Sequence, residues 1–200
     1  MKIHRAAAVW TPAGLQRDWS VVVEGRRITE VRPAIQGDPD PRDGMLIPGL
    51  VNAHLHIEMS WLRGQVPPGG GFSAWVRRMM LARKDSPSAV DQRASARAAA
   101  ERLVGYGTAA VCDISNAGDT ADLFAQVGIS GIVQHEFLSM DPARIPAQLA
   151  EIEKCGDILL TKNARIVTRP APHAAFSTAP ELVVASAREE HHVPSTIHIA

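Results

Sequence analysis

Two histidines separated by one residue, His54 and His56, have the spacing in this sequence that most clearly suggests chemistry. They follow the apolar run "LIPGLV", which is typical of a buried strand. In a strand, residues i and i+2 point to the same side, so both imidazoles can reach one point. Neutral imidazole is a good ligand for zinc and for ferrous iron. The alternative is two histidines with separate hydrogen-bond partners, and the pair alone does not decide between them.

Other polar side chains stand at or just past the ends of later apolar runs. They include Asp113, Glu136, His173 and His198. His198 ends the last of these runs, where it can face the same point as the first pair. Three histidines with a carboxylate and a water form a common open, catalytic metal site. The pattern therefore favours a catalytic site that holds one divalent metal ion, zinc or iron.

Composition excludes several classes of partner. Lys plus Arg and Asp plus Glu both number 21, so the net charge is zero and gives no electrostatic reason to expect nucleic acid or an anionic membrane. No apolar run reaches the roughly 18 to 20 residues of a membrane span, and the N-terminus lacks the apolar stretch of a signal peptide. The two cysteines stand in no CxxC pair, which favours free thiols in a reducing cytoplasm. We expect a cytoplasmic protein with a small-molecule substrate, and homo-oligomer formation stays open.

The chain changes character near residue 47. Residues 1–47 are expected to form short strands, with a hairpin around Glu24 and Gly25. From residue 48 onward, apolar runs alternate with helical patterns. Strands are expected at 46–52, 108–114, 130–138, 164–170 and 195–199. Helices are expected around 72–83, from the N-cap Ser86 and Pro87 to Gly105, at 117–127, at 142–155, and after a capping box of Thr178 and Glu181.

This alternation indicates an α/β fold with a parallel sheet covered by helices. A doubly wound sheet and a (β/α)8 barrel both fit it. Open sheets bind ligands mainly at one switch point, whereas barrels build their sites from the ends of several strands. Polar groups at every strand end favour the barrel. No GxGxxG or P-loop follows a strand, so no nucleotide cofactor is indicated.

The stretch "LIPGLVNAHLH" resembles the signature of the amidohydrolase superfamily, and the rest of the chain matches in order through "STIHIA". This resemblance implies a small β-sandwich, built partly from residues 1–47, that leads at residue 48 into a metal-dependent (β/α)8 barrel. In the cytosine-deaminase-like branch, the histidine pair and the strand-five histidine bind one metal ion. These are His54, His56 and His198 here. The strand-four histidine, which is His173 here, contacts the substrate.

The family pattern also continues beyond this chain. Its strand five reads His-x-x-Glu, and that glutamate moves protons, so the expected catalytic residue would directly follow Ala200. With about five strands, the barrel is incomplete. We expect residues 1–200 to be the N-terminal part of a longer enzyme and to lack activity alone. A compact 200-residue fold is the alternative.

The loop after the histidine pair, "HIEMSWLRGQVPPGGGFSAWV", is similar to that of the aminodeoxyfutalosine deaminases of menaquinone synthesis. Glu58, Arg63 and Trp75 would then edge a substrate pocket, and Glu136 resembles a strand-three glutamate of these enzymes. Alternatively, Glu58 is solvated, Arg63 pairs with an acid and Trp75 packs in the core.

The resemblance implies a hydrolytic deaminase that acts on an aminated purine nucleoside such as aminodeoxyfutalosine. Two alternatives stay open. One is a different C–N hydrolase of the family, acting on adenosine, S-adenosylhomocysteine, guanine or a cyclic amide. The other is a truncated chain that catalyses no reaction.

Overall fold

The computed structural model describes residues 1–155, 158–161, 164–187 and 195–199. The chain divides into two compact units, Met1–Gly49 and Leu50–Ala200, and each contains one five-stranded sheet. The assignment of the first 47 residues to a composite β-sandwich stays a prediction.

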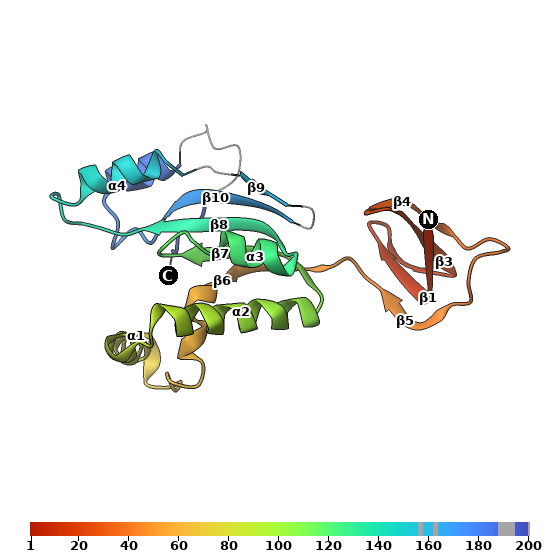
Figure 1. Ribbon diagram of the computed structural model, residues 1–200, viewed down its shortest axis with the longest axis horizontal. Coiled ribbons are helices and arrows are strands. Elements are labelled where there is room, and N and C mark those ends of the chain that lie inside the picture. Colours follow the sequence, from red (N-terminus) through yellow and green to blue (C-terminus); the bar gives the residue numbers. More distant parts are fainter. Residues whose placement is uncertain (156–157, 162–163, 188–194, 200) are drawn as a thin grey trace. The chain divides into compact units, whose positions relative to one another are not determined.

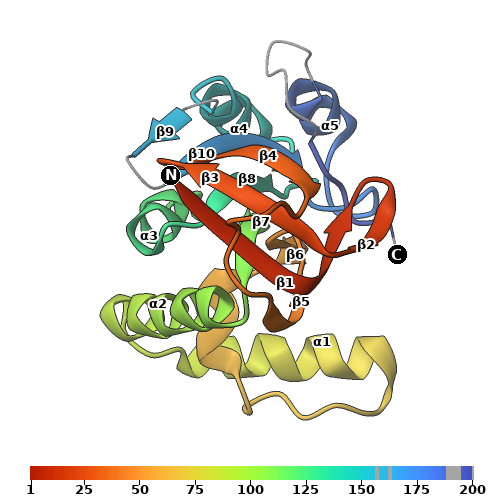
Figure 2. The same cartoon turned by 90° about the vertical axis from the view of Figure 1, so that its right-hand side faces the viewer.

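The first unit is built from strands alone, and Figure 2 shows three of them, β1, β3 and β4, side by side. Its strands are β1 (Lys2–Thr11), β2 (Gly14–Arg17), β3 (Trp19–Glu24), β4 (Arg27–Pro33) and β5 (Arg42–Leu46). The order is β2-β1-β3-β4, and β5 pairs in parallel with β1. The expected hairpin is confirmed, because β3 and β4 pair antiparallel across a turn in which Gly25 has a φ of +58°.

The second unit alternates strands and helices, as expected (Figure 1). Its strands are β6 (Leu50–Leu55), β7 (Thr108–Ser115), β8 (Ser130–Phe137), β9 (Ile158–Leu160) and β10 (Arg165–Pro172). Its helices are η1 (Ile57–Leu62), α1 (Gly71–Ala82), η2 (Arg83–Asp85), α2 (Ala89–Gly105), α3 (Ala121–Val127), α4 (Ile145–Ile152) and α5 (Pro180–Ser186), where η marks a 3-10 helix.

The sheet of the second unit has the order β6-β7-β8-β10-β9. The first four strands run parallel, which confirms the expected parallel α/β sheet, and the short β9 pairs antiparallel with β10. β9 is not among the predicted strands. Within the residues that the structure describes, the sheet is open.

The two faces of this sheet differ in character. Val133 of β8 belongs to an apolar core that it shares with α2 and α3. Phe137 of β8 belongs to a second apolar core, which it shares with α4 and α5. Because side chains alternate along a strand, Gln134 and Glu136 point to the opposite face. Polar side chains therefore collect on the face that the helices leave free.

Two predicted helix starts are wrong, for reasons of local hydrogen bonding. The helix expected from Ser86 and Pro87 begins at Ala89, because Ser88 is the N-cap and its hydroxyl accepts a hydrogen bond from the backbone N–H of Asp91 (3.2 Å). Thr178 forms no capping box, since its hydroxyl donates to the carbonyl of Phe137 (3.4 Å) and the next helix, α5, begins at Pro180.

The other boundaries shift by a few residues. The helix expected at 117–127 begins at Ala121, and the helix expected at 142–155 spans Ile145–Ile152. The strand expected at 46–52 begins at Leu50 instead. Residues 195–199 form no strand in the described structure; a single parallel bridge joins His198 to Ala174.

Two expectations from composition can be compared with the structure. Cys112 and Cys155 form no disulfide with each other in the described structure. Among the described residues, no helix has the length and apolar character needed to cross a membrane.

Candidate active site

The end of β6 presents the first two histidines. His54 lies within β6 and His56 is the next residue but one, so the period of the strand turns both imidazoles to one side. The chain is then held at Ile57, whose backbone N–H donates to the buried carboxylate of Asp113 on β7 (2.8 Å). Asp113 thus determines where the histidine pair leaves the sheet.

The third histidine is positioned by the segment that follows β10. The backbone N–H of His198 donates to the carbonyl of His173 (2.8 Å), and its Nδ1 lies 2.9 Å from the same carbonyl. A donating Nδ1–H fixes the ring orientation and leaves Nε2 free to act as a ligand. In this way β10 carries His198 to the same end of the sheet as β6.

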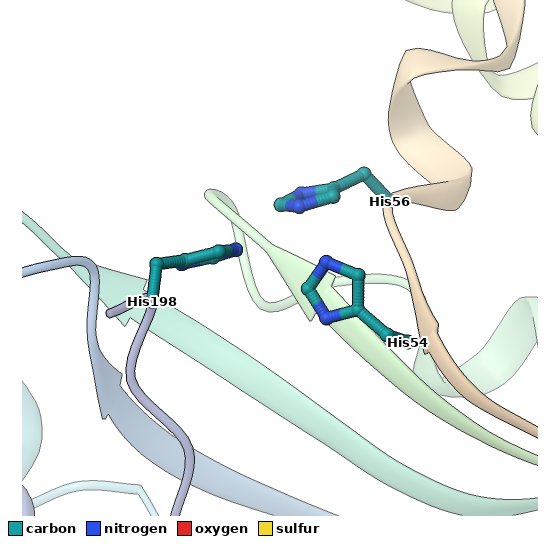
Figure 3. Close-up of side chains that lie close together, drawn as sticks. All are labelled: His54, His56 and His198. Atoms are coloured by element: carbon teal, nitrogen blue, oxygen red, sulfur yellow. The ribbon is translucent and has the colours of Figure 1, made fainter. Parts of the chain in front are cut away.

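The three imidazoles converge, as Figure 3 shows. The ring centroid of His54 lies 5.2 Å from that of His56 and 5.2 Å from that of His198. The centroids of His56 and His198 are 5.7 Å apart. One nitrogen from each ring lies within 4.8 Å of the other two. The three residues thus offer a shared set of ligand atoms, although His56 and His198 are 142 positions apart in the sequence.

The surroundings of His56 favour its neutral ring. Burial, together with the nearby rings of His54 and His198, lowers the pKa of His56 to about 4. Its Nδ1 is buried and has no hydrogen-bond partner among the described residues. A buried nitrogen of this kind is unfavourable unless a partner satisfies it, and its lone pair suits a cation. The three histidines therefore fit a divalent metal ion.

A second group of residues shares His198. Glu136 and His173 each offer an atom within 4.8 Å of one of its nitrogens. The Oε1 of Glu136 lies 3.5 Å from Nδ1 of His198, and only 6% of that side chain is exposed. Burial raises the pKa of Glu136. Burial lowers the pKa of His173, and the electrostatic effect of the nearby His198 lowers it further. The structure thus places two predicted substrate residues beside the histidine cluster.

Glu58 is held by the chain itself. Its carboxylate accepts hydrogen bonds from the hydroxyl of Ser115 (2.8 Å), the backbone N–H of Asn116 (3.0 Å) and the side-chain amide of Asn116 (2.7 Å). It is therefore not simply solvated. It connects η1 to the end of β7, and its role toward a substrate stays a prediction.

Arg63 and Trp75 do not join this group. Arg63 follows η1 and is exposed, and Trp75 lies on α1, where its ring stacks on Phe72 at a centroid distance of 6.2 Å. Trp75 is 39% exposed, so it is not a core residue in this structure. Their predicted contact with substrate stays a prediction.

Sequence reasoning missed the cavity beside the cluster. It has a volume of about 560 Å³ and is lined by η1, the start of η2, the first half of α2 and the segment after β7. Glu58 lies in its wall, as does Arg83, which is not among the predicted site residues. Arg83 sits among several arginines near the end of a helix, so no local pattern distinguishes it.

We compared the chain with known protein families, relatives and solved structures. The model of the amidohydrolase family matches residues 45–200, and the chain belongs to that family.

Individual relatives point the same way. The chain is 27% identical over 203 residues to a 5'-deoxyadenosine deaminase of Methanothrix thermoacetophila. The matched region covers 98% of this chain and 48% of that protein. Its fold resembles that of aminofutalosine deaminase from Helicobacter pylori in complex with methylthio-coformycin (TM-score 0.72, 19% identity, 100% of this chain and 50% of the other). It also resembles that of an adenosine deaminase from Xanthomonas campestris with bound zinc (TM-score 0.73, 21% identity, 98% and 48%). The chain spans about half the length of these relatives.

Proposed function

We propose that this protein is a metal-dependent hydrolytic deaminase that acts on the amino group of a purine nucleoside. The convergence of His54, His56 and His198 carries this proposal, because three imidazoles at one point are suited to hold a catalytic divalent ion. The 27% identity to a 5'-deoxyadenosine deaminase supports the nucleoside substrate. Aminodeoxyfutalosine is the first candidate, given the loop from Glu58 to Trp75 and the similar fold of an aminofutalosine deaminase. This reaction would place the enzyme in menaquinone synthesis, in the cytoplasm.

The proposal includes the architecture. The parallel strands β6, β7, β8 and β10 would be consecutive strands of a (β/α)8 barrel, with the helices outside and the polar face inside. Residues 1–47 would form part of the β-sandwich beside it. Site residues at the carboxyl ends of several strands support the barrel, since barrels assemble their active sites there.

The chain's own residues have separate tasks in this mechanism. His54, His56 and His198 would hold the ion, zinc or iron, which supplies an activated water at neutral pH. His173 would hydrogen-bond the purine ring, because its Nδ1 lies 2.6 Å from the hydroxyl of Ser177 and its Nε2 is left for the substrate. Glu136, whose pKa is raised by burial, would lie beside His198 and hydrogen-bond the purine ring.

The test is ammonia release by the intact protein. We would supply adenine, adenosine, S-adenosylhomocysteine, aminodeoxyfutalosine, guanine, cytosine and a cyclic amide, and compare kcat/KM. We expect one of the adenine nucleosides to be the best substrate. Guanine or cytosine as the best substrate, or no ammonia from any compound, would contradict the nucleoside assignment. Hydrolysis of the cyclic amide alone would favour the other C–N hydrolase.

A further inference from the structure

Arg169 of β10 is a buried, charged side chain on the polar face of the second sheet. Only 6% of the residue is exposed. Ile166 of the same strand packs in the core that the helices cover, so the alternation of side chains turns Arg169 to the opposite face. In the parallel register it lies level with Gln134 of β8. The guanidinium therefore belongs to the face that the helices leave free, and it is largely shielded from water.

The charge of Arg169 has no counter-charge in the part of the chain that the structure describes. Its Nε atom is buried and has no hydrogen-bond partner there. Burial lowers the pKa of Arg169, and no described carboxylate raises it. The buried carboxylate of Asp113 differs, because it accepts hydrogen bonds from the backbone N–H of Ile57 and the hydroxyl of Thr120. Of these two buried charged groups, Arg169 is the one without such partners.

This arrangement requires an anion. A guanidinium stays protonated at neutral pH, so it cannot avoid the cost of burial by losing its charge. A buried cation without a partner is strongly destabilising, and a paired anion offsets that cost. Strands β6, β7 and β8 contain no lysine or arginine, and Arg165, the other basic residue of β10, is exposed. A single buried positive charge is matched by a single negative one.

We propose that Arg169 binds one carboxylate group on the free face of this sheet. A guanidinium presents two parallel N–H donors, which fit the two oxygens of a carboxylate. His173 lies four residues further along the chain, about 13 Å away in an extended strand, so the site lies deeper in the sheet than the histidines. The carboxylate is either a small free acid, such as formate or acetate, or an aspartate or glutamate side chain from another segment of the protein. The inference does not depend on the proposed deaminase reaction.

The experiment follows thermal unfolding of the intact protein, with Arg169→Met and Arg169→Lys beside wild type. Methionine keeps much of the apolar stem but removes the charge, whereas lysine keeps a charge without the two parallel donors. With the carboxylate present, we expect Arg169→Met to lower the unfolding midpoint by about 5 °C or more, and Arg169→Lys to recover part of this loss. The matched control is Arg165→Met, on the same face of β10 but exposed, which should shift the midpoint by less than about 1 °C.

Replacing chloride by formate at constant ionic strength separates the two sources of the carboxylate. If it is a free acid, formate should raise the midpoint of wild type but not that of Arg169→Met, because only wild type binds it. Equilibrium dialysis with labelled formate should then find about one formate per wild-type chain and none in Arg169→Met. If it is a side chain of the protein, formate should change neither midpoint, and Arg169→Met should be destabilised in both salts.

Two results would overturn the carboxylate site. One is an Arg169→Met variant that unfolds at or above the wild-type temperature in both salts, since removing the guanidinium would then leave no anion unpaired. The other is an equal loss in Arg169→Met and Arg169→Lys with no response to formate, which would mean that the shape of the side chain matters and its charge does not.

Discussion

At the scale of single residues, the three histidines make a prediction about metal. The intact protein should contain about one zinc or iron ion per chain, and the double substitution His54→Ala and His56→Ala should abolish it, because one imidazole alone holds a divalent ion weakly. Elemental analysis of the purified proteins measures this.

The control for the metal prediction is His4→Ala. His4 lies on β1 in the first unit, is exposed and belongs to neither group of ligand atoms. Its substitution should leave the metal content unchanged. Equal metal in wild type and in the double variant would show that these histidines are not the ligands.

Glu58 makes a second prediction at this scale. In Glu58→Gln, one oxygen that accepts hydrogen bonds becomes an amide donor, which disturbs the contacts with Ser115 and Asn116. We expect kcat/KM for the nucleoside to fall about tenfold, in line with lost charge-assisted hydrogen bonds. Metal content should not change, because Glu58 is outside the three-histidine group.

Glu101→Gln is the matched control for Glu58, since Glu101 pairs with Arg97 on the exposed side of α2. A loss of metal in Glu58→Gln would mean that the residue supports the ion instead. Unchanged kinetics would mean that its hydrogen bonds do not affect the site.

At the scale of elements, Asp113 makes the link between β7 and η1 depend on pH. Burial raises its pKa to about 7, despite hydrogen bonds from Thr120 and Ile57 that favour the charged form. The unfolded chain ionises near the ordinary value of about 4. Between these two values the folded state binds more protons, so this group lowers the free energy of unfolding as pH rises from about 4 to about 7.

The expected result is a pH-dependent difference between wild type and Asp113→Asn. Asparagine cannot ionise, so the variant should gain stability relative to wild type as the pH is raised from 5 to 8. A shift of about three pKa units sets an upper limit of about 4 kcal/mol on this gain. Denaturant unfolding at several pH values measures it, and parallel stability curves would contradict the raised pKa.

The pairing of β7 with β8 makes a second prediction at the element scale. Gly131 is opposite Val111 in the parallel register and has a φ of +151°. A Cβ atom at Gly131 would lie 2.0 Å from the backbone carbonyl oxygen of Val111. Val111 lies on β7, which is paired on both sides, so its backbone cannot easily shift to relieve the clash. Gly131→Ala should therefore lower the free energy of unfolding by about 3 kcal/mol, at the upper end of overpacking effects.

Gly105→Ala provides the comparison for this effect. A Cβ atom at Gly105, the last residue of α2, would meet no atom within 4 Å. This change should leave stability equal or raise it by up to about 1 kcal/mol through helix propensity. Similar unfolding midpoints for both variants would show that β7 and β8 are less closely paired than the structure has them.

At the scale of the whole molecule, the two units differ in how much apolar surface they bury. The buried apolar side chains of the first unit are small, namely Ala6, Ala8, Val9 and Val22, and the unit contains no cysteine. Cores of this size rarely offset the conformational entropy of about 50 residues. A peptide of residues 1–49 should therefore be largely unfolded by itself.

Circular dichroism of this peptide, beside the intact protein in the same buffer, measures the prediction. We expect the spectrum of an unfolded chain and no cooperative thermal transition. A sharp melting transition would show that its β-sheet is stable alone.

Features that depend on local periodicity could be predicted from the residues alone. The period of two along β6 places His54 and His56 on one side, and the alternation of apolar strands with helices requires a parallel sheet. Polar residues at the strand ends then indicated where a site would form. The prediction of a parallel α/β sheet was confirmed because it uses neighbours within a few residues, whose geometry the backbone largely dictates.

Contacts that join distant segments could not be predicted from the residues and became visible in the folded chain. Glu58 binds Ser115 across 57 positions, and Asp113 holds Ile57 across 56. Arg83 lies in the wall of a cavity whose other sides come from η1, α2 and the segment after β7. Such contacts depend on strand register and on how loops cross the sheet, and no local pattern encodes either. For this reason the histidine pair was visible in the sequence, whereas the cavity beside it was not.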